Sequence, residues 1–341
     1  MQGIPRFIRS ATLYGYAELA ESAGLNVRLM LQRSGIAQSS LLAPDQWITA
    51  EAALDLLERS AQASGWDDFG LRLAARRRLA NLGQVSLVLR EEPTGLAAVQ
   101  TLSRYLQLVN PSLYTEVDVA GDVVIIREML LLNTDQPMRQ SMEMAVGVMH
   151  GTLRELLGES WRARRVCFTH RAPKSSAFAR RLLDCPVEYN AEFCGLVCDL
   201  SSLTQELPGR DAAWAQYSRQ QLDLALGQIA PSASDLVRQL ISALLPQGRC
   251  TADQVALQMR VDRRTVARRL AQEDTSFSAL LDDMRRHWVL RQLRDSDRSV
   301  TEIAQLLGFQ SVSAFGHWFA LHFGMSARQW RALQTMPAPP Q

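Results

Sequence analysis

A dense group of arginines lies in the C-terminal third of the chain. Four arginines fall within seven residues, and one threonine lies among them: Arg263, Arg264, Thr265, Arg268 and Arg269. A guanidinium group can bond O6 and N7 of one guanine together, or clamp a phosphate. A solvated helix face has a similar composition, so the chemistry depends on the scaffold that presents the arginines.

That scaffold is indicated by a repeated segment. Val255–Val261 and Ile303–Phe309 resemble each other, and a helical pattern follows each. Their alanines, Ala256 and Ala304, lie 48 residues apart and supply the small residue needed where two helices cross closely. A tight turn follows, eased in the second segment by Gly308. The pattern predicts two helix-turn-helix units, each presenting its second helix to the major groove of duplex DNA.

The second unit carries different surface residues. Those expected to face DNA are Gln310, Ser311, Ser313 and His317. Its aromatic residues fall at helical spacing, which favours a packed core over a platform for stacking single-stranded bases: Phe309, Phe315, Trp318, Phe319, Phe323 and Trp330. For His317, a plain surface position and a contact to phosphate or base are equally favoured.

Between the units the sequence predicts one amphipathic helix, Ser278–Asp295. Such a helix is ~27 Å long, about the separation at which two recognition helices reach successive major grooves. Thr301 or Ser299 is the expected N-cap of the helix that follows.

Size and charge agree with this interpretation. The 341 residues exceed one ordinary domain, and 47% are hydrophobic, so more than one packed core is expected. Residues 232–336 hold 14 arginines and 10 acidic residues, a net +4, whereas the remainder holds 23 basic and 25 acidic residues, a net −2. A basic C-terminal segment is consistent with nucleic-acid binding.

Other chemistry finds little support. The 5 cysteines lack regular spacing, which argues against a disulfide framework and for a reducing cytosol. Cys194 and Cys198 have no second Cys or His pair that would complete a metal site. The acidic pairs at 67–68 and 91–92 have no nucleophile or metal set beside them. We therefore expect a protein that is not an enzyme and needs no metal or cofactor.

Neither a signal peptide nor a membrane span is expected. Glu18 and Glu21 interrupt the apolar stretch near the start of the chain. Ile303–Ala327 lacks formal charges over a length that can span a bilayer, but its polar residues and helical spacing indicate a packed soluble segment.

The chain before residue 231 predicts an α+β domain. Helical periodicity recurs at 13–24, 49–65, 68–79, 94–108, 138–157, 176–183 and 212–227. Alternating residues predict a hairpin at 113–128 with its turn at Gly121, and short strands at 165–169, 187–189 and 196–198. The small residues of Ala230–Ser234 indicate a boundary, so we expect domains at 1–231 and 232–336 and a tail at 337–341.

Several methionines lie on or beside the predicted helix at 138–157. They are Met138, Met142, Met144 and Met149. Adaptable methionine side chains line many ligand pockets, so the wall of an effector site is one interpretation, with Met138, Met142 and Met149 as its candidates. Plain core packing is the favoured alternative.

The C-terminal motifs resemble those of the AraC/XylS family of transcription regulators. The resemblance runs from Ser232 to Leu333, and its motifs are Ser299–Ala304, Gly308–Phe309, Ser313–Phe315, Phe319 and Phe323–Arg331. Tyr105–Pro111 and Cys185–Tyr189 resemble the arabinose-binding type of sensor domain found in the ornithine-utilisation-regulator-like and VirS-like branch.

The resemblance implies a sequence-specific regulator that binds double-stranded DNA in the cytoplasm, frequently an activator and often a homodimer. It also implies a small effector bound in the N-terminal domain, and RNA polymerase as a partner. Two alternatives stay open: an N-terminal domain that only dimerises, and a sensor or enzyme whose helical C-terminal part is an interaction module without DNA binding.

The chain departs from the family at several positions. The family usually has a basic residue late in the second recognition helix, where this chain has His317. At the following family positions, which are often basic, this chain has Ala320 and Leu321. The second unit is therefore expected to hold DNA more weakly than the first. Arg260 and Thr275 stand where glycines are usual in the turns of the first unit.

Overall fold

The computed structural model describes residues 6–132, 134–207, 212–228, 232–245 and 250–335. The chain forms two compact units, one of residues 1–132 and 136–230 and the other of residues 133–135 and 231–341. The expected boundary at Pro231 and the expected tail at 337–341 lie outside the described residues.

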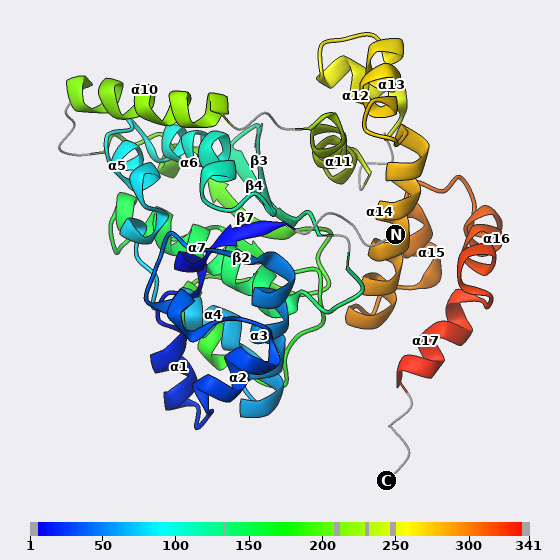
Figure 1. Ribbon diagram of the computed structural model, residues 1–341, viewed down its shortest axis with the longest axis horizontal. Helices are drawn as coiled ribbons and strands as arrows, with labels where there is room; N and C mark the ends of the chain where they lie inside the picture. The colour runs from blue at the N-terminus through cyan, green and yellow to red at the C-terminus, as the bar shows by residue number, and fades with distance from the viewer. Residues whose placement is uncertain (1–5, 133, 208–211, 229–231, 246–249, 336–341) are drawn as a thin grey trace. The chain divides into compact units, whose positions relative to one another are not determined.

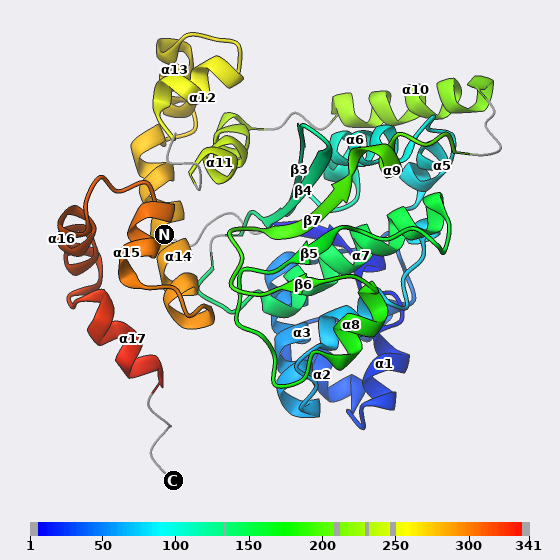
Figure 2. The ribbon, with the colours of Figure 1, turned by 180° about the vertical axis from the view of Figure 1, so that it is seen from behind.

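A five-stranded sheet lies at the centre of the N-terminal unit (Figures 1 and 2). Its strand order is β3-β4-β7-β5-β6. The strands are β3 (Leu113–Ala120), β4 (Val123–Leu130), β5 (Arg165–Cys167), β6 (Val187–Glu188) and β7 (Cys194–Asp199). β5 and β6 pair in parallel, whereas β3–β4, β4–β7 and β5–β7 pair antiparallel. A separate ribbon pairs β1 (Phe7–Arg9) with β2 (Trp47–Thr49).

The described residues of this unit also form helices. They are α1 (Tyr16–Ser22), α2 (Val27–Arg33), α3 (Ala50–Ser64), α4 (Phe69–Ala74), α5 (Gln84–Arg90), α6 (Gly95–Tyr105), α7 (Arg139–Leu157), α8 (Ala177–Leu183), α9 (Leu200–Leu203) and α10 (Ala212–Gln228). Of these helices, α6, α7 and α9 contact the sheet. Short 3-10 turns occupy Ser10–Leu13, Gln38–Leu41, Leu79–Leu82 and Leu106–Leu108. α7 contributes to two apolar cores: Val146 and Leu153 pack with the sheet, whereas Met144 packs with α1 to α4.

The contact between α4 and α7 requires a glycine. A Cβ at Gly70 would lie 2.0 Å from the carbonyl oxygen of Gln140, which no side chain can tolerate. The Gly70 N–H also donates to Gln140 Oε1 at 2.8 Å. The backbone of α4 at Gly70 therefore packs directly against the backbone of α7. Both apolar cores include residues of α7.

The structure confirms the α+β class and most of the expected elements. The hairpin turns at Gly121, whose φ is 64°, and Thr49 caps α3 by accepting from the Ala52 N–H. The expected helix at 68–79 ends earlier, at Ala74. Helices α2, α5 and α9 and the β1–β2 ribbon were not predicted, because segments of 7, 7, 4 and 3 residues show too little of either period.

The C-terminal unit is helical throughout its described secondary structure. Its elements are α11 (Ala233–Leu244), α12 (Ala252–Gln258), α13 (Arg263–Ala271), α14 (Phe277–Asp295), α15 (Val300–Leu306), α16 (Val312–Phe323) and α17 (Ala327–Thr335). One apolar core runs through it, to which α14 contributes Leu280, Met284 and Leu293. The predicted linker helix is thus confirmed as one continuous helix, and it contributes to the core that both helix pairs share.

Side-chain caps and turns fix where these helices start and stop. Ser299, rather than Thr301, caps α15, and Glu302 completes a capping box with it. Arg260 takes the left-handed conformation that Gly308 takes in the second unit, with φ of 52° and 70°. After α13 the left-handed residue is Asp274, at φ 52°. The expected turn position at Thr275 is therefore one residue too late, because the Asp274 and Thr275 N–H groups together close the helix onto Ala271 and Leu270.

Replacing Ala304 by leucine should destabilise the C-terminal unit. Ala304 is buried beside the turn of the second helix pair, so a larger side chain must displace packed neighbours, at a cost of roughly 1–3 kcal/mol. Thermal unfolding of Ala304→Leu measures this, with Ala320→Leu as the control on an exposed position of α16. Equal melting of the two variants would place Ala304 away from the crossing.

Candidate DNA interface and ligand cavity

The first helix-turn-helix consists of α12 and α13. Asp262 begins α13 as its N-cap, accepting from the Thr265 N–H at 2.7 Å and from the Thr265 hydroxyl at 2.9 Å. The first of these bonds contributes most to holding the pKa of the Asp262 carboxyl below its ordinary value. Val266 and Leu270 are buried and bring α13 onto the core. The opposite face is left to solvent.

Four arginines occupy that exposed face: Arg263, Arg264, Arg268 and Arg269. Arg263 lies 3.7 Å from the carboxylate of Asp253, and both side chains are well exposed. Within the described residues, Arg264, Arg268 and Arg269 have no ion-pair or hydrogen-bond partner. Thr265 lies among them, but its hydroxyl is engaged by the cap. The arginines are therefore available to a polyanion.

The second unit matches the first once the two N-caps are aligned. Ser311 caps α16 by accepting from the Ala314 N–H, as Asp262 caps α13. Buried Phe315 and Phe319 then correspond to Val266 and Leu270. The same alignment places Ser313 at the position of Arg264 and His317 at that of Arg268. Both residues, with Gln310, are exposed.

α16 is anchored to α14 through one carboxylate that the sequence analysis missed. The indole Nε1 of Trp318 donates to Asp282 Oδ1 at 2.6 Å, and His322 Nε2 lies 3.0 Å from the same oxygen. Arg285 adds a bond from Nε to the Leu307 carbonyl at 2.9 Å and stacks over Phe309 at 4.5 Å. The only sequence signal was an acidic residue on the inward side of the linker helix.

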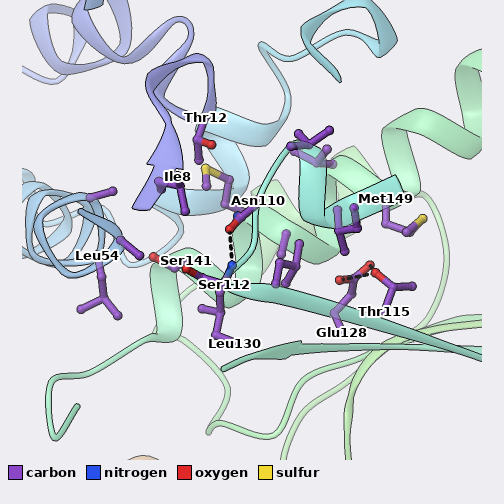
Figure 3. A pocket seen from close by; sticks show the side chains of 18 of the residues that line it. Ile8, Thr12, Leu54, Asn110, Ser112, Thr115, Glu128, Leu130, Ser141 and Met149 are labelled. Atoms are coloured by element: carbon purple, nitrogen blue, oxygen red, sulfur yellow. Dashed lines mark hydrogen bonds between the residues drawn. The ribbon is translucent and has the colours of Figure 1, made fainter. Parts of the chain in front are cut away.

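The N-terminal unit contains a largely apolar cavity, shown in Figure 3. It encloses about 80 Å³ of free space, several times the roughly 10–15 Å³ that one buried water needs. Ile8, Leu54 and Met149 form parts of its wall, which extends from the β1 ribbon and α3 to α7. Of the methionines singled out by sequence, Met144 and Met149 line the cavity. Met138 and Met142 lie outside its lining and pack in the cores.

A buried acid also lines this cavity. Glu128 and Thr115 are each 2% exposed and face one another across the β3–β4 pair, with Thr115 Oγ1 3.1 Å from both carboxyl oxygens. Burial raises the pKa of Glu128 to about 8. Sequence reasoning did not single out Glu128, although a lone acid at the third inward position after Val124 and Ile126 was a usable signal.

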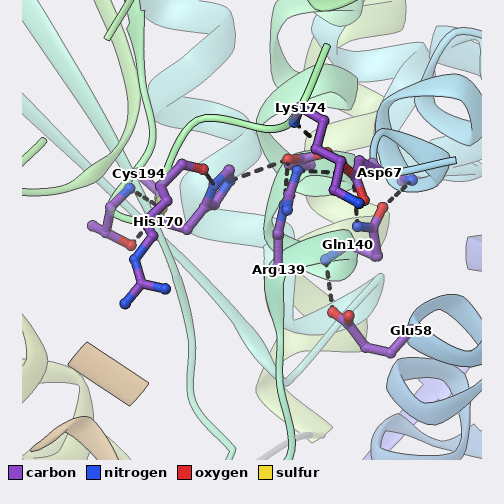
Figure 4. A network of polar contacts seen from close by, with 11 residues as sticks. Glu58, Asp67, Arg139, Gln140, His170, Lys174 and Cys194 are labelled. Atoms are coloured by element: carbon purple, nitrogen blue, oxygen red, sulfur yellow. Dashed lines mark hydrogen bonds and ion pairs between the residues drawn. The ribbon is translucent and has the colours of Figure 1, made fainter. Parts of the chain in front are cut away.

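A second polar cluster of this unit serves the fold (Figure 4). Arg139 and Gln140, at the start of α7, both donate to the Asp67 carbonyl, at 2.9 and 3.0 Å. The Gln140 N–H donates to Glu58 Oε1 at 2.8 Å, and the Lys174 N–H donates to Asp67 Oδ2 at 3.3 Å. These bonds tie α3, the loop before α4 and a distant loop to one helix end.

No group of three or more His, Cys, Asp or Glu side chains among the described residues is placed to hold a metal ion. No helix in the same ranges combines the length and the apolar composition that crossing a bilayer requires.

Comparison with known proteins agrees with this geometry. Residues 24–207 match the arabinose-binding domain of AraC transcription regulators, and residues 255–333 match a helix-turn-helix domain model. The HTH-type transcriptional regulator VirS of Mycobacterium tuberculosis is 29% identical over 95% of this chain and 96% of its own length. The transcriptional activator AggR of Escherichia coli is 31% identical over 28% of this chain and 36% of its own.

Among solved structures, that of the transcriptional regulator CdpR from Pseudomonas aeruginosa aligns over 92% of this chain and 98% of its own. Its TM-score is 0.41 and its sequence identity 20%. The paired helix-turn-helix units and the N-terminal domain define a helix-turn-helix transcription regulator. With the N-terminal family model covering 24–207, the chain belongs to the AraC family of transcription regulators.

Removing single arginines from α13 should weaken DNA binding without harming the fold. Arg264→Ala and Arg268→Ala each remove an exposed, unpaired guanidinium, at an expected cost of about 1–3 kcal/mol in specific binding. Arg286→Ala is the matched control, because it removes the same charge from an arginine held by Asp282 and Asp283 on α14. Fluorescence anisotropy with operator DNA measures the change. Unchanged affinity in both α13 variants would reject this interface.

Proposed function

We propose that this chain is a sequence-specific regulator of transcription, with residues 1–231 as sensor and dimerisation domain and residues 232–336 as the DNA-binding domain. The main support for this proposal is the exposed arginine face of α13, presented on a helix-turn-helix scaffold. Guanidinium groups there can reach guanine edges in the major groove, or phosphates beside it. The full candidate set is Arg263, Arg264, Thr265, Arg268, Arg269, Gln310, Ser311, Ser313 and His317.

The two units act on one duplex in this proposal. α14 has 19 residues and is therefore ~28 Å long, close to the ~34 Å that separates successive major grooves on one face of DNA. The first unit supplies most of the base reading, because Ser313 and His317 replace Arg264 and Arg268 in the second. Footprinting and salt titration of the full chain test this proposal. A footprint in one groove, or affinity without a steep salt dependence, would contradict it.

Replacing His317 by arginine should strengthen DNA binding. The new guanidinium occupies the position that Arg268 has in the first unit, where it can contact a phosphate. We expect the slope of log affinity against log salt to steepen by up to ~0.9, the value for one added phosphate contact on duplex DNA. Leu333→Arg, at an exposed position of α17 outside the candidate contact set, is the control for added charge alone. Equal slopes for His317→Arg and wild type would mean that α16 packs the unit without reading DNA.

The sensor role rests on the cavity beside α7. Its apolar wall with a few polar groups is typical of a small-molecule site. We propose that an effector bound there controls an activator that works in the cytoplasm with RNA polymerase. Met149 and Met144 contribute to the wall, and Met138 and Met142 support it from the cores. An effector that binds without altering DNA affinity or transcription would contradict this role.

A homodimer is the proposed assembly, and α10 offers a surface for it. α10 buries Ala215 and Leu222 but exposes Trp214, Tyr217 and Leu224 on its other side, at 46%, 54% and 65%. An apolar stripe of this kind is typical of a helix that packs against a partner. A second copy of the chain presents the same stripe, so the two can pair about a two-fold axis.

Charged substitutions on this stripe should separate the dimer. Trp214→Glu and Leu224→Glu place carboxylates within the proposed apolar contact, whereas Gln216→Glu, on another exposed side of α10, is the control. Sedimentation velocity should show monomers for the first two variants and dimers for the control. Dimers in all three would place the interface elsewhere.

A further inference from the structure

The polar groups on the wall of the N-terminal cavity have incomplete hydrogen bonding. Ser112 is 1% exposed, and its hydroxyl has no partner within the described residues. The Nε of Arg77 is likewise buried without a partner. Both residues line the cavity. Buried polar atoms are nearly always hydrogen-bonded, so two unsatisfied donors at one cavity indicate a ligand that accepts from them.

Arg77 brings an uncompensated positive charge to this wall. Its Nη1 donates to the backbone carbonyls of Ala11 and Thr12, at 2.9 and 2.6 Å. No carboxylate of the described residues forms an ion pair with it. Burial, and to a smaller degree Arg9, lower the pKa of Arg77 to about 10. The group is therefore cationic at neutral pH, and a nearby anion would be strongly favoured in these apolar surroundings.

The Glu128–Thr115 pair makes another part of the cavity neutral. With the pKa of Glu128 at about 8, the pair carries two O–H groups at neutral pH, of which one is used between the partners. Cys194 pairs with Glu128 in register on β7, but its sulfur contacts Thr169. Among the cavity-lining residues, Arg77 and Glu128 are the ionisable ones. Ser112 lies in the turn before β3, whereas Thr115 is within that strand.

We propose that this cavity binds a small monocarboxylate with an apolar body, its carboxylate held by Arg77 and Ser112. This inference rests on the effector role proposed above and names the chemical class of the effector. The apolar body fits the wall, in which 16 of the 23 lining residues are apolar, including Leu54, Leu102 and Met149. A sugar would bury more hydroxyl groups than such a wall can satisfy. A dicarboxylate would bury its second charge without a cation beside it, because Arg77 is the one cationic residue of the described lining.

The test uses the full-length protein and calorimetric titration with four probes: hexanoate, hexanamide, adipate and arabinose. Hexanoate should bind at least about tenfold more tightly than hexanamide or adipate, since a charge-assisted bond in an apolar site is worth that much. Arg77→Met should lose this preference for hexanoate, and Arg76→Met, which changes an exposed neighbour outside the cavity, should keep it. Equal affinity for hexanoate and hexanamide, tight binding of arabinose, or failure of hexanoate to bind would each overturn the inference.

Glu128→Gln supplies a second readout in case the Arg77 variant does not fold. Ionisation of Glu128 above its pKa of about 8 places a second negative charge in the cavity, so wild-type affinity for hexanoate should fall by up to about tenfold for each further pH unit. The glutamine variant should bind equally at about pH 7 and about pH 9, because Arg77, with its pKa of about 10, stays mostly cationic between them. A parallel loss of affinity in both proteins would overturn the inference.

DNA affinity measured with and without hexanoate separates this inference from the effector role. Hexanoate that binds and changes DNA affinity supports both. Hexanoate that binds through Arg77 but leaves DNA affinity unchanged supports the ligand class and contradicts effector control. Arabinose that binds and changes DNA affinity overturns the carboxylate class and leaves effector control standing.

Discussion

The turn between the two helices of each DNA-binding unit determines the direction in which the DNA-facing helix leaves. In both units the same backbone bond closes the first helix: the Val261 N–H donates to the Ala256 carbonyl, and the Phe309 N–H donates to the Ala304 carbonyl, at 3.1 and 3.0 Å. This bond turns the chain back against the end of the first helix. The residue at that crossing, Ala256 or Ala304, is buried and must be small. The exposed arginine face exists because α13 leaves this turn with Val266 and Leu270 directed inward.

Sequence reasoning succeeded where a feature is local and periodic. The repeat, the hairpin at Gly121 and the cap at Thr49 are each encoded within a few residues. It failed where the cause is tertiary. Gly70 is small because Gln140, far away in the sequence, touches its backbone, and Asp282 becomes an anchor only once α16 folds against α14. The turn at Gly308 could be predicted from its glycine. The left-handed conformation of Asp274 could not, because it depends on where α13 ends.

The N-terminal unit combines two requirements in a single helix. α7 holds the cores together through Val146 and Met144, and its flank supplies Met149 to the cavity. A buried acid beside that helix is costly if ionised, so the fold retains Glu128 as a neutral group in contact with Thr115. An apolar residue of similar size would be the simpler choice for packing. Its absence is consistent with a cavity that recognises a polar group.

Under the function proposed above, helix α14 has a consequence for α16, which is expected to hold DNA more weakly than α13. Because one continuous helix of 19 residues joins the two helix pairs within a shared core, the second pair would reach its groove as soon as the first had docked. The binding of the second helix pair is then intramolecular. For short connections, the effective concentration of such a pair at its site is on the order of millimolar. In the proposed complex, a surface with Ser313 and His317 would thus prolong residence on DNA even if it bound too weakly to find a site alone. Selection on these two positions would then act on dissociation rates, and base preference would be set elsewhere.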